Sequence, residues 1–223
     1  MKILVINPVG TNRWDEKDKK TCQEFASLDT QIDVISLPEG PLSIETPESE
    51  AQVIPLVIKI AIENQRKYDA IIVNCYLDPA IDLLKGIIKI PAVGPCEASL
   101  ALASTIGKKI GIITISNKVI WMIEDKVREL GFRDKVVYIS GIPLGVLDLD
   151  KNTERTKSLI IKEAKKAIKN GSEVIVLGCT GLAGLAKEIQ DIINVPVIDP
   201  TGAAIKIAES LVKLNLYNAL YGK

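Results

Sequence analysis

Residues 174–184, VIVLGCTGLAG, carry a run of aliphatic side chains directly into a cysteine that has glycines close by on both sides. Residues 71–81, IIVNCYLDPAI, place Cys75 in the same way after a second aliphatic run. A short apolar run bounded by turn-forming residues is typical of a buried parallel strand. We therefore expect Cys75 and Cys179 at the carboxyl ends of two buried strands.

The two cysteine stretches belong to an internal repeat that spans most of the chain. Residues 2–7, KILVIN, align with residues 109–114, KIGIIT, and this alignment pairs Asn7 with Thr114. At nearly the same offset, three further pairs align, namely Pro38 with Pro143, Cys75 with Cys179 and Pro91 with Pro196. Several matches at one offset indicate two copies of one structural unit.

Short β-branched runs alternate with longer amphipathic segments, a pattern that favours parallel strands joined by crossover helices. We predict an α/β fold of two pseudo-symmetric lobes, each a mostly parallel sheet flanked by helices, with the active site between them. Lobe 1 is expected over residues 1–100, with the C-terminal segment 201–223 packing back on it, and lobe 2 over residues 105–200. Strands are expected at 2–7, 32–37, 69–74, 91–94, 109–115, 135–140, 173–178 and 196–199.

Signals at helix ends support this division of the chain. Thr46 followed by Pro47 predicts a helix start, because threonine caps helices and proline fits their first turn. Pro55 lies inside the same helix and is expected to bend or interrupt it. Gly131 and the pair Asn170-Gly171 predict the ends of two later helices.

Composition excludes several classes of function. Lys plus Arg and Asp plus Glu number 28 each, so no basic surface is expected to bind nucleic acid or an anionic membrane. The chain has no histidine, which removes the commonest general base and zinc ligand. No run is long enough to span a bilayer, and the N-terminus does not resemble a signal peptide. We expect a cytoplasmic homo-oligomer that acts on a small molecule.

The paired cysteines suggest a chemistry. Ligands of open parallel sheets bind beyond the carboxyl ends of the strands, and duplicated units pack around a pseudo-two-fold axis. Cys75 and Cys179 would then enter one cleft from opposite sides, each with a helix starting directly after it, which favours the thiolate. One thiolate could remove a proton from carbon while the opposite thiol returns one to the other face. Gly178 and Gly181 would let backbone amides approach the substrate, and Thr114, the counterpart of Asn7, is expected at the substrate site as well.

This pattern predicts racemisation or epimerisation without a cofactor, because the sequence contains neither common glycine-rich phosphate-binding motif. The competing interpretation is that each cysteine fills space in the core, as buried cysteines commonly do. Cys22 and Cys96 are expected to pack rather than react, although Cys96 could line the edge of the cleft. The four cysteines have no C-x-x-C spacing, so neither a metal site nor a redox pair is expected.

Four stretches resemble the aspartate/glutamate racemase superfamily, and within it the hydantoin racemases: INPVGT, NCYLDPAIDLLKG, PAVGPCEAS and VIVLGCTGL. The resemblance covers essentially the whole chain. It implies two pseudo-symmetric lobes, no cofactor, and Cys75 and Cys179 as the opposed acid and base. It also places Asn7, Asn74, Tyr76 and Thr180 at positions that contact substrate, and Glu97 at a position familiar in hydantoin racemases.

Departures from glutamate racemases bear on the substrate. The chain has Asn7-Pro8, Tyr76-Leu77 and Thr180-Gly181 where glutamate racemases have an acidic residue with serine, Asn-Thr and Thr-His. The site is therefore expected to lack an acidic partner for an ammonium group, which favours a 5-monosubstituted hydantoin over a free amino acid. Two alternatives stay open: an amino-acid racemase, decarboxylase or isomerase of the same superfamily, and a non-enzymatic two-lobed module that binds a small ligand.

Overall fold

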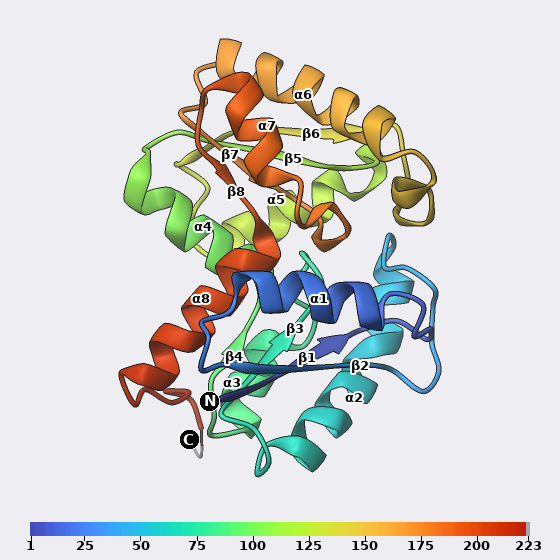
Figure 1. Cartoon of the computed structure of the whole chain (residues 1–223), viewed down its shortest axis with the longest axis vertical. Coiled ribbons are helices and arrows are strands. Elements are labelled where there is room, and N and C mark those ends of the chain that lie inside the picture. The colour runs from blue at the N-terminus through green and yellow to red at the C-terminus, as the bar shows by residue number, and fades with distance from the viewer. Residues whose placement is uncertain (222–223) are drawn as a thin grey trace. The chain divides into compact units, whose positions relative to one another are not determined.

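The computed structural model describes residues 1–221, which form two compact units (Figure 1). Unit 1 consists of residues 1–95 and the C-terminal segment that begins at Thr201, and unit 2 consists of Cys96–Pro200. The chain therefore passes from one unit to the other directly after Pro95 and directly after Pro200. These two prolines follow the aligned Pro91 and Pro196 by four residues each.

Unit 1 is built on a four-stranded parallel sheet with the strand order β2-β1-β3-β4. Helix α1 lies on one face of the sheet and helices α2 and α3 on the other (Figure 1). In chain order the elements are β1 (Lys2–Asn7), α1 (Asp15–Phe25), β2 (Gln31–Ser36), α2 (Pro47–Asn64), β3 (Ala70–Val73), α3 (Ile81–Ile87) and β4 (Ala92–Val93), and α8 (Pro200–Lys213) completes the unit.

Unit 2 repeats this architecture with the strand order β6-β5-β7-β8, again all parallel. Its sheet is also flanked by helices, so the predicted fold class is confirmed. The elements are α4 (Pro95–Ile106), β5 (Ile110–Ile115), η1 (Asn117–Val119), α5 (Ile120–Glu129), β6 (Val136–Ile142), η2 (Val146–Lys151), α6 (Thr153–Lys169), β7 (Val174–Leu177), η3 (Thr180–Leu182), α7 (Ala186–Ile193) and β8 (Val197–Ile198).

The two units exchange their last helices. Helix α4 follows the last strand of the unit 1 sheet but belongs almost wholly to unit 2, and α8 follows the last strand of the unit 2 sheet but belongs to unit 1. Within unit 1, a Cβ atom on Gly202 would lie 2.9 Å from the ring of Phe25, so the start of α8 packs closely against the end of α1.

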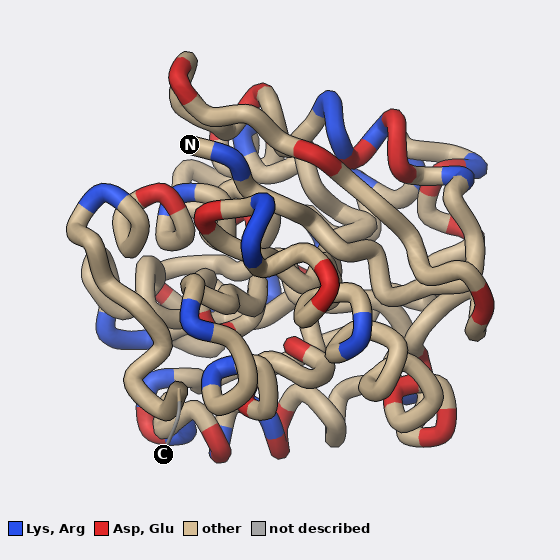
Figure 2. The backbone as a smooth tube through the Cα atoms, turned by 90° about the horizontal axis from the view of Figure 1, so that it is seen from below, with Lys and Arg blue, Asp and Glu red and all other residues tan. Residues whose placement is uncertain are grey.

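Hydrophobic burial explains the central strands. Every residue of β3, β5 and β7 is buried, and β1 is buried from Ile3 onward, whereas the edge strands β2 and β6 are partly exposed. Central parallel strands are covered on both faces and therefore read as continuous apolar runs. Charged residues of both signs are interspersed along the backbone (Figure 2). Among residues 1–221, no helix combines the length and the apolar character that crossing a bilayer requires.

The structure confirms most of the predicted helix ends and corrects one expectation. Thr46 caps α2 through a reciprocal hydrogen-bond pair with Ser49, and Gly131 and Gly171 follow α5 and α6 with positive φ angles of 76° and 93°. Of the bend or interruption expected at Pro55, the interruption does not occur, because α2 continues through this residue to Asn64. A proline removes one backbone donor from a helix. Burial of Val53, Val57 and Ala61 along one face of α2 favours the intact helix nonetheless.

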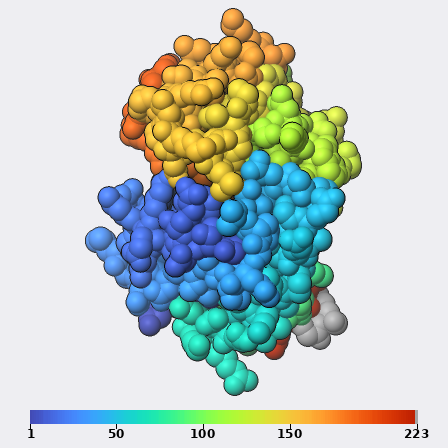
Figure 3. Space-filling model, turned by 90° about the vertical axis from the view of Figure 1, so that its right-hand side faces the viewer, coloured from blue at the N-terminus to red at the C-terminus, as the bar shows by residue number. Residues whose placement is uncertain are grey.

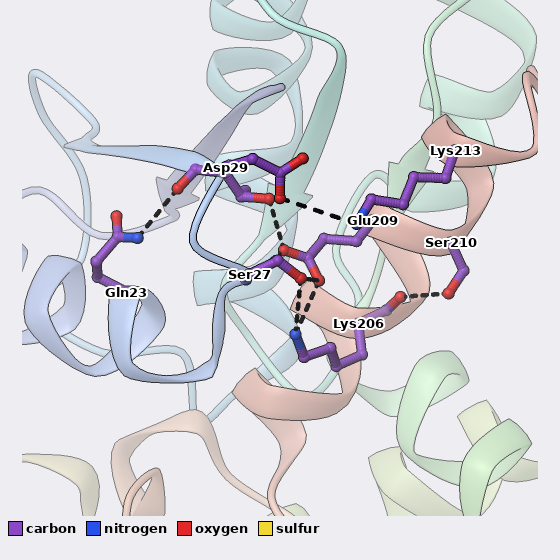
Figure 4. Close-up of polar contacts among 8 residues, drawn as sticks. Gln23, Ser27, Asp29, Lys206, Glu209, Ser210 and Lys213 are labelled. Atoms are coloured by element: carbon purple, nitrogen blue, oxygen red, sulfur yellow. Dashed lines mark hydrogen bonds and ion pairs between the residues drawn. The ribbon is translucent and has the colours of Figure 1, made fainter.

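A buried carboxylate fastens α8 to the turn that follows α1 (Figure 4). Glu209 accepts hydrogen bonds from the backbone N–H and the hydroxyl of Ser27 at 2.7 and 2.8 Å, from the hydroxyl of Thr30 at 2.6 Å and from Nζ of Lys206 at 2.9 Å. Burial raises the pKa of Glu209, but these hydrogen bonds to its charged form outweigh burial and lower the pKa to about 2.

We predict that Glu209 makes the stability of the protein sensitive to acid. The pKa of this carboxyl is lower in the folded protein, about 2, than its model value of 4.5, so its stabilising effect is present above pH 4.5 and is lost as the pH falls toward 2. The shift corresponds to about 3 kcal/mol of unfolding free energy. Urea unfolding across this pH range should show the loss in the parent, and Glu209→Gln should be less stable at pH 7 with a flatter dependence on pH.

Asp191→Asn provides the matched control for this prediction. The carboxylate of Asp191 pairs with Lys187 at 2.8 Å, but both side chains are exposed, and such pairs contribute little to stability. This variant should therefore unfold like the parent at every pH. A Glu209→Gln variant that keeps the stability and the pH dependence of the parent would show that the contacts of Glu209 do not fasten α8.

Candidate active site

Cys75 lies directly beyond β3, at the carboxyl edge of the unit 1 sheet. Its backbone N–H donates to the carbonyl of Val73 at 2.8 Å, and the residue is half-buried. The expectation that a helix starts immediately after it is wrong. The chain first passes through Asp78 and Ala80 with positive φ angles of 53° and 65°, and α3 begins only at Ile81. The start of α3 is thus separated from the thiol by a turn whose two left-handed residues are not glycines.

Asp78 packs against the end of the neighbouring strand β4. Its side chain is buried, and a Cβ atom placed on Gly94 would lie 2.2 Å from Cγ of Asp78. Gly94 therefore leaves room for the side chain of Asp78, which a larger residue at this position would have to displace. This contact holds the turn after Cys75 against the sheet, and the sequence interpretation did not identify it.

Asn7, the last residue of β1, and Asn74, the first residue after β3, come together next to Cys75 in unit 1. The Nδ2 of Asn74 donates to Oδ1 of Asn7 at 2.9 Å, and Nδ2 of Asn7 donates to Oδ1 of Asp15 at 2.9 Å. Asp15 also accepts from the hydroxyl of Ser36 at 2.6 Å, and Asp18 lies 3.4 Å from Nδ2 of Asn74. The strand ends and the first turn of α1 thus form one polar cluster.

This cluster corrects the expectation that the site lacks an acidic partner. Asp15 and Asp18 both lie in the first turn of α1, three residues apart and hence on one face of the helix. Both carboxylates accept hydrogen bonds from side-chain amides of the predicted site. Sequence reasoning missed them, although acidic residues that open a helix after the first strand are a detectable signal.

Figure 3 views the side toward which the β1 arrow of Figure 1 points, where the N-terminal part of the chain (blue) forms much of the unit 1 surface.

Cys179 occupies the equivalent place in unit 2, directly beyond β7. It is 9% exposed, and the short helix η3 starts at the next residue, Thr180, which is half-buried. A Cβ atom on Gly181 would lie 3.5 Å from Sγ of Cys179 and 2.9 Å from Cδ1 of Leu149. Leu149, on η2, therefore packs over the turn that carries the thiol, and the sequence interpretation did not identify this contact.

Thr114 ends β5 as Asn7 ends β1, but its contact is different. Its hydroxyl is fully buried and donates to the carbonyl of Gly178 at 2.7 Å. A Cβ atom on Gly178 would lie 2.7 Å from the side chain of Ile112 and 3.0 Å from that of Thr114, so this position has no room for a side chain. In each unit the polar residue on the first strand contacts the residue that precedes the cysteine. Only unit 1 uses amide side chains for this contact.

The other predicted residues lie mainly in the packed interior. Tyr76 is 4% exposed, Cys22 and Cys96 are fully buried on α1 and α4, and Glu97 is half-buried in the first turn of α4. All four cysteines are thiols rather than disulfides. Within residues 1–221, no three Cys, Asp or Glu side chains converge in a group that could hold a metal ion.

The chain matches the family model described as Asp/Glu/Hydantoin racemase over residues 3–208. It is 34% identical over 216 residues to a hydantoin racemase of Pseudomonas sp. (strain NS671), which covers 96% of this chain and 87% of the relative. A hydantoin racemase of Paenarthrobacter aurescens is 33% identical over 217 residues and covers 96% of this chain and 92% of the relative.

A solved structure described as allantoin racemase from Klebsiella pneumoniae superposes with a TM-score of 0.94 at 27% identity, covering 100% of this chain and 94% of the other. The match to the family extends over almost the entire chain, and the relatives align over nearly their full lengths. The predicted resemblance and the prediction of an isomerase are both confirmed: this chain belongs to the Asp/Glu/hydantoin racemase family and is an enzyme of the racemase type.

Proposed function

We propose that the protein is a cofactor-independent racemase of 5-monosubstituted hydantoins, with Cys75 and Cys179 as the acid and the base. The observation that carries this proposal is the equivalent placement of the two thiols, each directly beyond the third strand of its own sheet. Relatives described as hydantoin and allantoin racemases support the substrate class, since allantoin is itself a hydantoin substituted at C5.

The chemistry needs one thiol on each face of the substrate carbon. The C5 proton of a hydantoin is adjacent to a carbonyl, so its removal by one thiolate gives an enolate that nearby N–H donors stabilise. The opposite thiol then delivers its proton to the other face of C5. The first sulfur ends as a thiol and the second as a thiolate, so the enzyme is left ready for the reverse reaction.

The polar cluster of unit 1 supports a ring substrate over a dicarboxylic amino acid. Asp15 and Asp18 place negative charge next to Asn7 and Asn74, and this charge would repel the carboxylates of aspartate or glutamate. The same carboxylates are the one observation that favours the alternative of an amino-acid racemase, because they could attract an ammonium group. Their bonds to the two asparagine amides favour the hydantoin, since an acceptor already engaged is less suited to a substrate cation.

We predict turnover of 5-monosubstituted hydantoins and little activity on free aspartate or glutamate. Polarimetry of the purified protein with each pure enantiomer of a hydantoin series and of both amino acids measures this directly. Ready racemisation of either amino acid, with every hydantoin inert, would favour the alternative instead.

We predict that Cys75→Ser and Cys179→Ser each abolish racemisation, because a serine hydroxyl is far too weakly acidic to serve as the base near neutral pH. Each variant should still exchange the C5 proton of one enantiomer for deuterium, through the remaining thiolate, without inverting it. Proton NMR of each pure enantiomer in heavy water distinguishes exchange from inversion.

Cys22→Ala is the control for the cysteine variants, because Cys22 is buried on α1 and has no part in the proposed chemistry. It should racemise at the rate of the parent, provided that its thermal midpoint shows a folded protein. Full racemisation by either serine variant would exclude the mechanism with two thiols and leave the family assignment intact.

A further inference from the structure

Four side chains of unit 1 form a continuous series of hydrogen bonds that leads from β2 and α1 to the residue before Cys75. The hydroxyl of Ser36 and Nδ2 of Asn7 both donate to Oδ1 of Asp15, at 2.6 and 2.9 Å. Oδ1 of Asn7 accepts from Nδ2 of Asn74 at 2.9 Å. All these contacts lie within a single unit, and Asn7 is 3% exposed.

The charge on Asp15 gives this series a direction. An ionised carboxylate can only accept hydrogen bonds, so Asn7 must turn its NH₂ group toward Asp15. The carbonyl of Asn7 then faces Asn74, and Asn74 must in turn present its own NH₂ group. Asp18 reinforces this orientation, because its Oδ2 lies 3.4 Å from the same Nδ2 of Asn74. The amide carbonyl of Asn74 is consequently the group turned away from Asn7, and its oxygen is buried.

The location of Asp15 at the start of a helix suits its role as a hydrogen-bond acceptor. It lies with Glu16 and Asp18 in the first turn of α1. Negative side chains in the first turn of a helix interact favourably with the partial positive charge of the helix N-terminus. Charge-assisted hydrogen bonds of this kind are also about twice as strong as neutral ones, so the acceptor at the start of the series is the strongest link in it.

Unit 2 has no counterpart to this series. At the matching positions, Thr114 donates to a backbone carbonyl at 2.7 Å, and Gly178 stands where unit 1 has Asn74. The orientation of a backbone carbonyl is determined by the main chain and not by the side chain that donates to it. The two units therefore place a cysteine at the same point beyond the third strand but differ in the polar groups beside it, and unit 1 carries the side-chain amides that can recognise a substrate.

We propose that Asp15 is a positioning residue of the racemase: through Asn7 it fixes the amide of Asn74 with its carbonyl as the acceptor for a ring N–H of the substrate. This inference rests on the proposed function and deepens it. It identifies the recognised feature as a ring N–H donor, which a hydantoin carries at N1 and at N3 and a carboxylate lacks. Asp15 itself does not touch the substrate.

The test combines changes in the enzyme with a change in the substrate. The parent and Asp15→Ala are compared on a 5-substituted hydantoin and on the same compound methylated at N1 or at N3, which removes one N–H at a time. In the parent, methylation of the recognised nitrogen should lower kcat/KM by roughly 10- to 100-fold, the effect of one buried hydrogen bond. Asp15→Ala should lower kcat/KM for the unmethylated ring by a similar factor and should lose most of this discrimination.

Three further variants separate positioning from a structural role. Ser36→Ala removes the other hydrogen bond to Oδ1 of Asp15 and leaves the bond from Asn7, so it should keep the discrimination of the parent. Asp29→Ala makes the same change in charge at an exposed site of unit 1, where the carboxylate pairs only loosely with Lys213 at 3.9 Å, and should behave like the parent. Asp15→Asn keeps an acceptor oxygen and should restore part of the discrimination. Circular dichroism confirms that each variant is folded.

Each outcome decides the inference. Asp15→Ala with undiminished discrimination against the methylated ring contradicts it, and so does an equal loss in Ser36→Ala, which would mean that Asp15 only ties α1 to β2. If the parent racemises no hydantoin at all, both the proposed function and this inference are wrong. If the parent racemises hydantoins and Asp15→Ala behaves like the parent, the inference is wrong and the proposed function stands.

Discussion

The hydrogen-bond register between the first and third strands of each sheet is the constraint on which the placement of Cys75 and that of Cys179 both depend. Asn74 donates its backbone N–H to the carbonyl of Ile6, and Gly178 donates to the carbonyl of Ile113, both at 2.8 Å. These bonds place the cysteine one residue further, where the chain leaves the sheet. A shift of one residue in either strand would turn its side chains to the opposite face of the sheet. The close packing of the buried side chains of β1, β3, β5 and β7 opposes that shift.

Because the register is the same in both units, the duplicated scaffold conserves where the thiols lie while leaving the neighbouring groups to differ. Asn7 and Asn74 form an amide pair in unit 1, whereas Thr114 and Gly178 bring a hydroxyl to a backbone carbonyl in unit 2. Racemisation requires equivalent chemistry on the two faces of one carbon but a single way of binding the ring. The proposed mechanism would meet the first requirement through the equivalent thiols of the two units and the second through their different neighbours.

The sequence predicted those features that depend on local pattern or on the repeat. Continuous apolar runs in the sequence identified the central strands. The alignment of Cys75 with Cys179 predicted that the two cysteines occupy equivalent positions. Features that depend on neighbours across the sheet could not be predicted in this way. Asp15 meets Asn7 only because α1 returns over the end of β1, and Asp78 meets Gly94 because β3 and β4 are adjacent. The turn that delays α3 carries no glycine, so the usual marker of positive φ was absent at Asp78 and Ala80.

Helix α1 connects the packing of unit 1 to its polar cluster. Its first turn carries Asp15, its buried face carries Cys22, and the turn after its last residue carries Ser27, which Glu209 of α8 fixes through two hydrogen bonds. The helix is thus held at its start by Asp15, which accepts two hydrogen bonds, and near its end by Glu209, which accepts three from the following turn. The orientation of the Asn7 and Asn74 amides depends on where Asp15 lies, and the C-terminal helix limits how far α1 can move. The packing of α8 on unit 1 therefore stabilises the helix whose first turn contacts the amides of Asn7 and Asn74, although no residue of α8 belongs to the proposed reaction.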